Sequence, residues 1–369
     1  MTRAGTAGDS DRVSAALRQP GQLPQLSAHD WEVLIRQARR AQLLGRVACM
    51  VEAQGSMDAA PAAPRAHFAA AVIVAEAQQV EALRELCHID RALAHTGVRP
   101  VLLSGAAYVA AGLLPAMGCL FSTIDLFVPE CRVLETEAAL LAGGWGNGHH
   151  AAHQQRHCRR WMHRVPTMRH PRRQTELRIY HAIRPQTKRF VSISEALLGR
   201  AQVLPKLPGF SVLADTDMVL QCMVHLFHDD RLDQSLRELS DLDLLLRHFA
   251  RVPAFWPNLL DRAQELEVLR PLHHGLRFAH RLLATPVPSP ILEAADAGAP
   301  GRAVSTLSDW LWTRALRPQH STASSRGTAT ALLALRMRAN WLRMPPLVLL
   351  RHLTLKAFEA RETPRSANA

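Results

Sequence analysis

The segment from Pro100 to Ile124 constrains the fold most, because it contains no charged residue over a length that could cross a membrane. Turn-forming residues interrupt it at Ser104-Gly105, Gly112, Pro115 and Gly118. The segment also lacks the aromatic belt and the basic cluster that flank membrane spans. We therefore expect no membrane span. The pattern instead predicts a short buried strand at Arg99–Leu103, a Gly-containing turn and a buried helix over Ala106–Leu114.

A second strand is predicted at Ile124–Val128, where Pro129 ends it. It carries one inward acid, Asp125, between apolar neighbours. Alternate residues of a strand point to the same face, so Thr123 shares a face with Asp125. The strand, turn, helix and second strand together form an α/β unit around which the chain is organised.

Helical periodicity dominates the chain before and after this unit. Helices are predicted from Asp30, over Cys49–Gln54 and Ala63–Thr96, then over Glu130–Leu141, and later over Asp217–His228, Leu232–Phe249, Pro257–Leu283 with a break near Pro271, Arg302–Leu316 and Thr330–Phe358. Two more strands are predicted at Arg159–Met168 and Thr175–Ile183, and the pattern from Ser194 onward indicates helices again. The expected fold class is α+β, with a small mixed sheet, N-terminal helices and a C-terminal helical domain.

Changes in composition suggest the domain boundaries. We expect a flexible N-terminus at 1–27, N-terminal helices at 28–97, the α/β core at 98–190, a helical domain at 191–283, C-terminal helices at 284–361 and a disordered tail at 362–369. The hydrophobic content of 48% is enough for a sizeable core in a chain of 369 residues.

The chain is strongly basic, with 44 Lys and Arg against 32 Asp and Glu, a net charge of +12. Such a balance attracts nucleotides, nucleic acids and anionic surfaces. The arginines are dispersed over predicted helices without a recognition motif, so nucleic acid is not an expected partner. The six cysteines form no CxxC pair, which argues against a zinc ribbon or a disulfide framework and favours reduced thiols in the cytoplasm.

Asp125 and Glu176 are the candidate catalytic and metal-binding residues. Phosphoryl and nucleotidyl transfer need divalent metal ions held by carboxylates, because negative charge develops on the phosphate oxygens. Glu176, on the later predicted strand, can supply a carboxylate next to Asp125. Ser104-Gly105 precedes a predicted helix, where backbone N–H groups bind phosphate. The candidate cofactor is therefore Mg²⁺, and the candidate substrate is an NTP.

Each of these features also has a structural alternative. Asp125 could cap a nearby helix, Glu176 could be a solvated strand residue, and Ser104-Gly105 could be an ordinary turn. His149, His153 and His157 have the spacing of one helix face and could bind a metal. The Gly, Gln and Arg residues around these three histidines favour a solvated loop instead.

His225 and His228 lie on an apolar predicted helix with Phe227. The sequence favours histidines of a core or of a domain interface there over metal ligands.

Several motifs together resemble the bacterial nucleotidyltransferase family related to the polymerase-β superfamily. The motifs are Leu103-Ser-Gly-Ala-Ala107, Phe121-Ser-Thr-Ile-Asp-Leu-Phe-Val128, Gly143-Gly-Trp145, Val165-Pro-Thr-Met-Arg-His170, Glu176-Leu-Arg-Ile-Tyr-His181, Val224-His-Leu-Phe-His-Asp229, Leu239-Ser-Asp-Leu-Asp-Leu-Leu245 and Asp30-Trp31. The resemblance covers Asp30 to about Leu283. It implies a nucleotidyltransferase-like core and a nucleotide site formed by Ser104, Gly105, Ala106, Thr123 and Arg178, with Asp125 and Glu176 as metal ligands.

Three positions depart from the family pattern. Ser104 stands where the family usually has Lys, Cys119 or Leu120 where it has Arg, and Thr123 where it has the first Asp of a pair. A neutral hydroxyl binds Mg²⁺ poorly.

Two hypotheses about function follow from these departures. The chain transfers NMP from an NTP to an unknown protein or small-molecule acceptor, or it keeps only nucleotide binding as a degenerate member. The alternative is a non-catalytic, partner-binding module in a peptide-modification or polysaccharide-assembly pathway. The three departures favour a degenerate site.

Overall fold

The computed structural model describes residues 11–120, 123–147, 158–159, 164–173, 175–182 and 190–343. The helices are α1 (Arg12–Arg18), α2 (Ala28–Arg40), α3 (Leu44–Ala53), α4 (Ala62–Leu93), α5 (Ser104–Ala111), α6 (Val133–Ala142), α8 (Phe190–Leu198), α9 (Asp215–His228), α10 (Ser235–Phe249), α11 (Phe255–Glu265), α12 (Leu269–Leu283), α13 (Ser289–Ala295), α14 (Arg302–Ala315) and α15 (Thr328–Arg343). The strands are β1 (Val101–Leu103), β2 (Thr123–Phe127), β3 (Gly146–Asn147), β4 (Met168–Arg169), β5 (Glu176–Tyr180), β6 (Gln202–Leu204) and β7 (Leu207–Val212).

The strands form one mixed sheet in the order β3-β4-β5-β2-β1-β7-β6. β1 runs antiparallel to β2 and parallel to β7, and β2 runs parallel to β5. β2 and β5 are the two longest strands of the middle of the sheet, and both bury their central residues. Their apolar residues therefore fix the register, since a slip by one residue would turn them to the opposite face.

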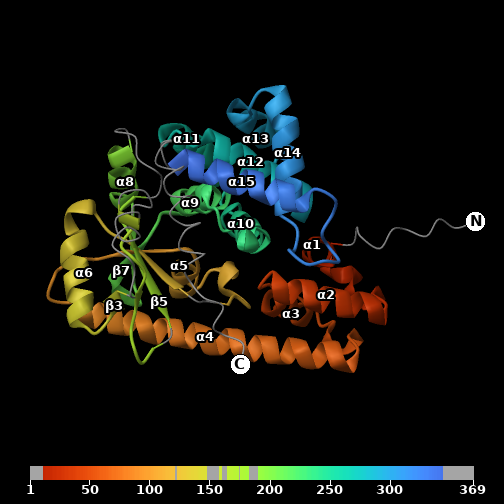
Figure 1. Cartoon of the computed structure of the whole chain (residues 1–369), viewed down its shortest axis with the longest axis horizontal. Coiled ribbons are helices and arrows are strands. Elements are labelled where there is room, and N and C mark those ends of the chain that lie inside the picture. The colour runs from red at the N-terminus through yellow and green to blue at the C-terminus, as the bar shows by residue number, and fades with distance from the viewer. Residues whose placement is uncertain are drawn as a thin grey trace, which may run out of the picture.

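Helices lie on both sides of the sheet and extend away from it (Figure 1). The long helix α4 passes beneath the sheet and continues under α2 and α3. At 1.5 Å per residue its 32 residues span about 48 Å. α9, α10 and α12 pack against one another on the side of α5 that faces away from α4 (Figure 1). One contiguous hydrophobic core joins all of these layers, from Val13 in α1 to Leu335 in α15.

The expected α+β class, with N-terminal helices and a C-terminal helical region, is confirmed. The structure differs at a hairpin, β6–β7, in a stretch that the sequence predicts to be helical. Its strands are short, and Pro205-Lys206 forms the turn between them. β7 pairs with β1 through partners far away in sequence, which local periodicity does not reveal.

Several boundaries also differ from expectation. The strand expected over Arg159–Met168 is short: Arg159 is helical, the described strand β4 is Met168–Arg169, and residues 160–163 lie outside the described part. The break expected near Pro271 falls earlier, between α11 and α12, because a proline is tolerated in the first turn of a helix. Residues 12–18 form α1, whose Val13 and Leu17 are buried, in the segment expected to be flexible.

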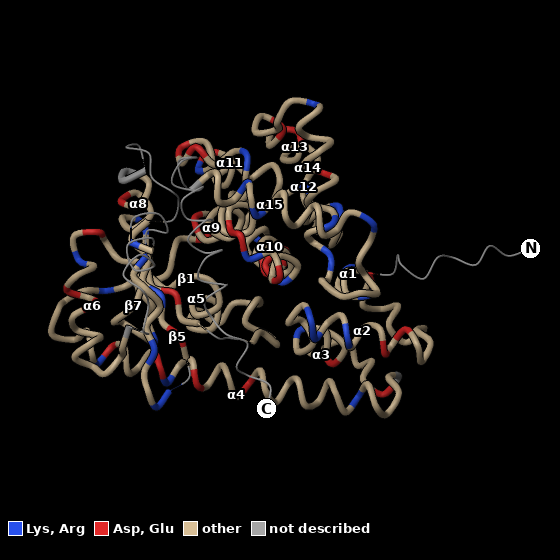
Figure 2. The backbone as a smooth tube through the Cα atoms, in the orientation of Figure 1, with Lys and Arg blue, Asp and Glu red and all other residues tan. Residues whose placement is uncertain are grey.

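The described helices include none that is long and apolar enough to cross a membrane. Charged residues are spread over helices throughout the molecule, as Figure 2 shows. Acidic and basic segments lie close together near β5 and on α10.

Candidate functional site

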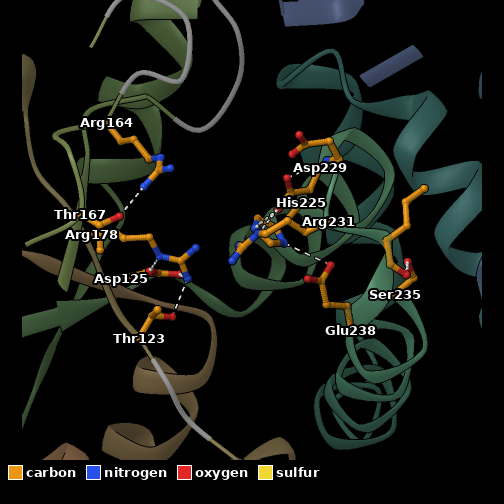
Figure 3. Close-up of polar contacts among 12 residues, drawn as sticks. Thr123, Asp125, Arg164, Thr167, Arg178, His225, Asp229, Arg231, Ser235 and Glu238 are labelled. Atoms are coloured by element: carbon orange, nitrogen blue, oxygen red, sulfur yellow. Dashed lines mark hydrogen bonds and ion pairs between the residues drawn. The ribbon is translucent and has the colours of Figure 1, made fainter. Parts of the chain in front are cut away.

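A small cavity of about 50 Å³ lies between the sheet and the helices α9 and α10. It is lined by Ser104, Gly105, Tyr108, Thr123, Asp125, Arg178, Cys222, His225, Arg231, Gln234, Arg237, Glu238 and Asp241. Figure 3 shows the two walls facing each other, with Thr123, Asp125 and Arg178 on the sheet side and His225, Arg231 and Glu238 on the helical side.

The sheet wall is built around an ion pair between Asp125 and Arg178. These residues are register partners on the parallel strands β2 and β5, so their side chains lie on the same face. Arg178 donates from Nε to Asp125 Oδ1 at 2.7 Å and from Nη2 to Oδ2 at 3.1 Å. The same Nη2 donates to Thr123 Oγ1 at 2.5 Å. Both residues are buried, with 6% of Asp125 and 7% of Arg178 exposed.

This pairing favours the charged form of the arginine. Burial by itself would lower the pKa of Arg178, because it disfavours a charge. The carboxylate of Asp125 outweighs burial, so the pKa of Arg178 lies above its usual value. The guanidinium is therefore a permanent cation between the hydroxyl of Thr123 and the carboxylate of Asp125.

Glu176 lies on the same face of the sheet, opposite Thr123 in the register. Its carboxylate forms an ion pair with Arg169 of the neighbouring strand β4. Glu176 does not line the cavity, whereas Thr123 and Asp125 do. The sequence predicts that the two acids lie on two strands, and the structure shows these strands to be adjacent. Each acid has a different arginine as its partner, Arg178 for Asp125 and Arg169 for Glu176.

The turn after β1 supplies the third side of the cavity. Ser104 is the first residue of α5 and has a φ of +50°, a left-handed conformation that costs free energy in a residue other than Gly. Ser104 and Gly105 line the cavity, and Ala106 is buried in α5 behind them. Backbone N–H groups at the start of a helix have no partner within the helix and favour anions.

The helical wall contains a chain of polar contacts centred on His225. Its Nε2 lies 3.3 Å from Asp229 Oδ2, and its Nδ1 lies 3.2 Å from Glu238 Oε2. Burial alone would lower the pKa of His225, but the two carboxylates outweigh it, and the pKa lies above its usual value. Arg231 pairs with the same Asp229 at 3.2 Å. His225 is thus held by side-chain partners within the wall, and the neighbouring His228 contacts the backbone oxygen of Val224.

Arg237 lies on the helical wall and is partnered by neutral groups rather than by a carboxylate. It donates from Nη1 to Gln42 Oε1 at 3.1 Å, and its buried Nε has no hydrogen-bond partner. Among the described residues no carboxylate lies within ion-pair distance of its guanidinium. Asp241 lies one turn further along α10 and forms an ion pair with the buried Arg46 of α3 at 2.7 Å.

Sequence reasoning found the sheet side and the turn of this cavity, and it missed the cations of the helical side. Arg231 and Arg237 follow the quoted motif that ends at Asp229, but nothing in their spacing sets them apart from other surface arginines. Arg231 lies just before α10 and Arg237 lies on it, and the packing of α10 against α9 and the short helix η3 (Leu114–Ala116) brings this part of the chain to the cavity. The three histidines His149, His153 and His157 lie outside the described residues.

The carboxylates that line the cavity do not suit the divalent metal ion that the family pattern implies. Each carboxylate that lines the cavity already has a protein cation: Arg178 for Asp125, His225 for Glu238 and Arg46 for Asp241. In the part of the chain that the structure describes, no three His, Cys, Asp or Glu side chains are placed to hold one ion.

Comparison with known proteins identifies the family. A family model described as an uncharacterised nucleotidyltransferase matches residues 27–284, which include the whole sheet and the helices α9 to α12. No curated protein and no solved structure matches the chain. Because the matched residues make up more than half of the chain and contain the cavity, the chain belongs to this nucleotidyltransferase family.

Proposed function

We propose that this chain is a nucleotidyltransferase-like protein that retains a site for a nucleoside triphosphate and has lost the family's transfer of NMP to an acceptor. The observation that carries the proposal is the occupation of both carboxylate oxygens of Asp125 by Arg178. Asp125 is the only acid on β2, so both carboxylate oxygens of that strand are already paired with a cation at the place where a catalytic metal would bind.

The retained features suit phosphate. The start of α5 offers backbone N–H groups at Ser104 and Gly105, and Arg237 offers a buried Nε without a partner. These groups lie on different walls of one cavity, so a phosphate between them would receive donors from both. Small-molecule sites usually measure about 300–1,000 Å³. The nucleoside must therefore lie outside this cavity, or the walls must separate when it binds.

Calorimetric titration with ATP, GTP, CTP and UTP tests binding. At low salt we expect measurable affinity for at least one triphosphate, and a steep loss of affinity as salt screens the arginines. Arg237→Met should weaken binding at least tenfold, because it removes the unpartnered donor. Arg164→Met is the matched control, since Arg164 contacts Thr167 and does not line the cavity. Binding that is equally strong in Arg237→Met, or no binding by any nucleotide, contradicts the proposed site, and the second outcome favours the partner-binding alternative.

Pyrophosphate release tests the loss of transfer. NMP transfer from an NTP releases pyrophosphate whatever the acceptor is, but it does so only when an acceptor is present, so the assay is run with a mixture of candidate protein and small-molecule acceptors. We expect no release above the rate without protein. Release by the wild type that disappears in Asp125→Asn would show an active enzyme and overturn this part of the proposal.

A further inference from the structure

The position of Arg178 has a consequence for the metal ion that the family implies. The guanidinium lies on the sheet face shared by Thr123 and Asp125, the face on which the family pattern has its pair of acids. It contacts the hydroxyl of Thr123 and both oxygens of Asp125 at 2.5 to 3.1 Å. A metal ion bound between these two residues would need the same oxygen atoms.

Charge and burial make this contact durable. The pair is more than nine-tenths buried, and the pKa of Arg178 is raised by its partner, so the arginine stays charged at any pH at which the protein is folded. A bidentate guanidinium fits a carboxylate with two parallel hydrogen bonds. Breaking it to admit a metal ion would leave a buried cation without a partner, which is strongly unfavourable.

We infer that Arg178 takes the place of the divalent metal ion, so that this site accepts a nucleotide triphosphate free of metal. The neutral Thr123 and the cationic Arg178 together balance the charge on the sheet wall. A neutral hydroxyl at 123 leaves a single negative charge on β2, and one guanidinium neutralises it. If β2 carried two acids, one guanidinium would neutralise only one of them and the sheet wall would keep a net negative charge. The ligand class rests on the proposed nucleotide site, whereas the exclusion of metal by Arg178 stands on the ion pair itself.

The first experiment uses Mn²⁺ as a probe and does not involve a nucleotide. Mn²⁺ binding is followed by the loss of the free-ion electron paramagnetic resonance signal and by thermal melts. We expect no stoichiometric binding and no melting shift for the wild type. Thr123→Asp alone should behave in the same way, because Arg178 already contacts the side chain at position 123 and would also pair with a carboxylate there. Thr123→Asp with Arg178→Met should bind one Mn²⁺ and melt a few degrees higher with it.

Two controls keep this experiment decisive. Asp125→Asn with Arg178→Met removes the ion pair without adding an acid and should show no response to Mn²⁺. Arg262→Met with Asp217→Asn removes an equivalent buried bidentate pair, which joins α9 to α11 away from the cavity. Stoichiometric Mn²⁺ binding by the wild type that Asp125→Asn abolishes overturns the inference, and this result needs only folded wild type and one single variant.

The second experiment measures ATP affinity with excess EDTA and with Mg²⁺. We expect the two dissociation constants to agree within about twofold, because the one carboxylate of β2 is already paired with Arg178 and offers no contact to a metal ion that accompanies the nucleotide. Affinity more than tenfold tighter with Mg²⁺ contradicts the inference. If ATP binds in neither condition, the proposed nucleotide site fails, while the Mn²⁺ experiment still decides whether Arg178 excludes the metal.

Discussion

Arg178 holds both carboxylate oxygens of Asp125 across two adjacent parallel strands, in a pair of hydrogen bonds of 2.7 and 3.1 Å. Members of the family are expected to hold a metal ion at this place. In this chain the positive charge of Arg178 neutralises the negative charge of Asp125 on the sheet wall of the cavity. Its stability, its geometry and the surrounding scaffold can each be tested.

The first prediction concerns the cost of breaking this pair. Asp125→Asn or Arg178→Met alone should each lower the free energy of unfolding by about 3–5 kcal/mol, because the remaining charge stays buried without a partner. The double variant should cost clearly less than the sum of the two. Urea unfolding of all four proteins gives the coupling free energy. Additive losses would show that the two side chains do not form a pair in solution.

The second prediction concerns the strained turn at Ser104. Ser104→Gly should raise the free energy of unfolding by about 0.5–1 kcal/mol, because Gly adopts the φ of +50° without the clash of a Cβ atom. Ser104→Ala keeps the Cβ atom and should bring no such gain. If the turn binds phosphate through its backbone N–H groups, nucleotide affinity should survive in Ser104→Gly. A loss of affinity in both variants would assign the contact to the hydroxyl.

The third prediction compares two glycines that both have a positive φ, Gly118 at +61° and Gly55 at +63°. A Cβ atom on Gly118 would lie 2.3 Å from the backbone carbon of Gly45, next to Arg46, whereas a Cβ atom on Gly55 meets nothing within 4 Å. Gly55→Ala should therefore cost only about 1 kcal/mol from its backbone conformation. Gly118→Ala should cost about 3 kcal/mol, since backbone must also move. Equal losses in chemical denaturation would mean that the loop and α3 are not in contact.

The fourth prediction concerns pH. His274 is 4% exposed and packs against Phe227, with ring centroids 5.5 Å apart. Burial, followed by the nearby cations including His273, lowers the pKa of His274 to about 4. Because the pKa in the unfolded chain is about 6.5, the unfolded chain takes up the proton first, and stability is lost as pH falls from that value toward 4.

The size of this effect follows from the two pKa values. The contribution of His274 is fully present above about pH 6.5, and about 2 kcal/mol of it should be lost by pH 5. His274→Phe removes the titrating group and keeps an aromatic ring. Its free energy of unfolding should therefore fall less between pH 7 and pH 5 than that of the wild type. Parallel pH profiles for the two proteins would show that His274 is not neutral in the folded state.

The sequence by itself determined the α/β unit, because its signals are local. The uncharged run from Pro100 and the turn at Ser104-Gly105 predict a buried strand and helix, and Asp125 stands out as the one acid between apolar residues on the next strand. The structure places Ser104, Gly105, Thr123, Asp125 and Arg178 around one cavity, whereas Ala106 and Glu176 do not line it.

Tertiary structure decided which charges meet. Glu176 and Arg178 lie on the same strand and the same face, and the sequence alone does not say which of them faces Asp125. The parallel register places Arg178 opposite Asp125 and leaves Glu176 to Arg169 on β4. Arg237 reaches the same cavity only through the packing of α10. Pairing between strands and packing between helices depend on the burial of apolar surface from distant parts of the chain, and for that reason local patterns did not reveal the partners of the charged groups.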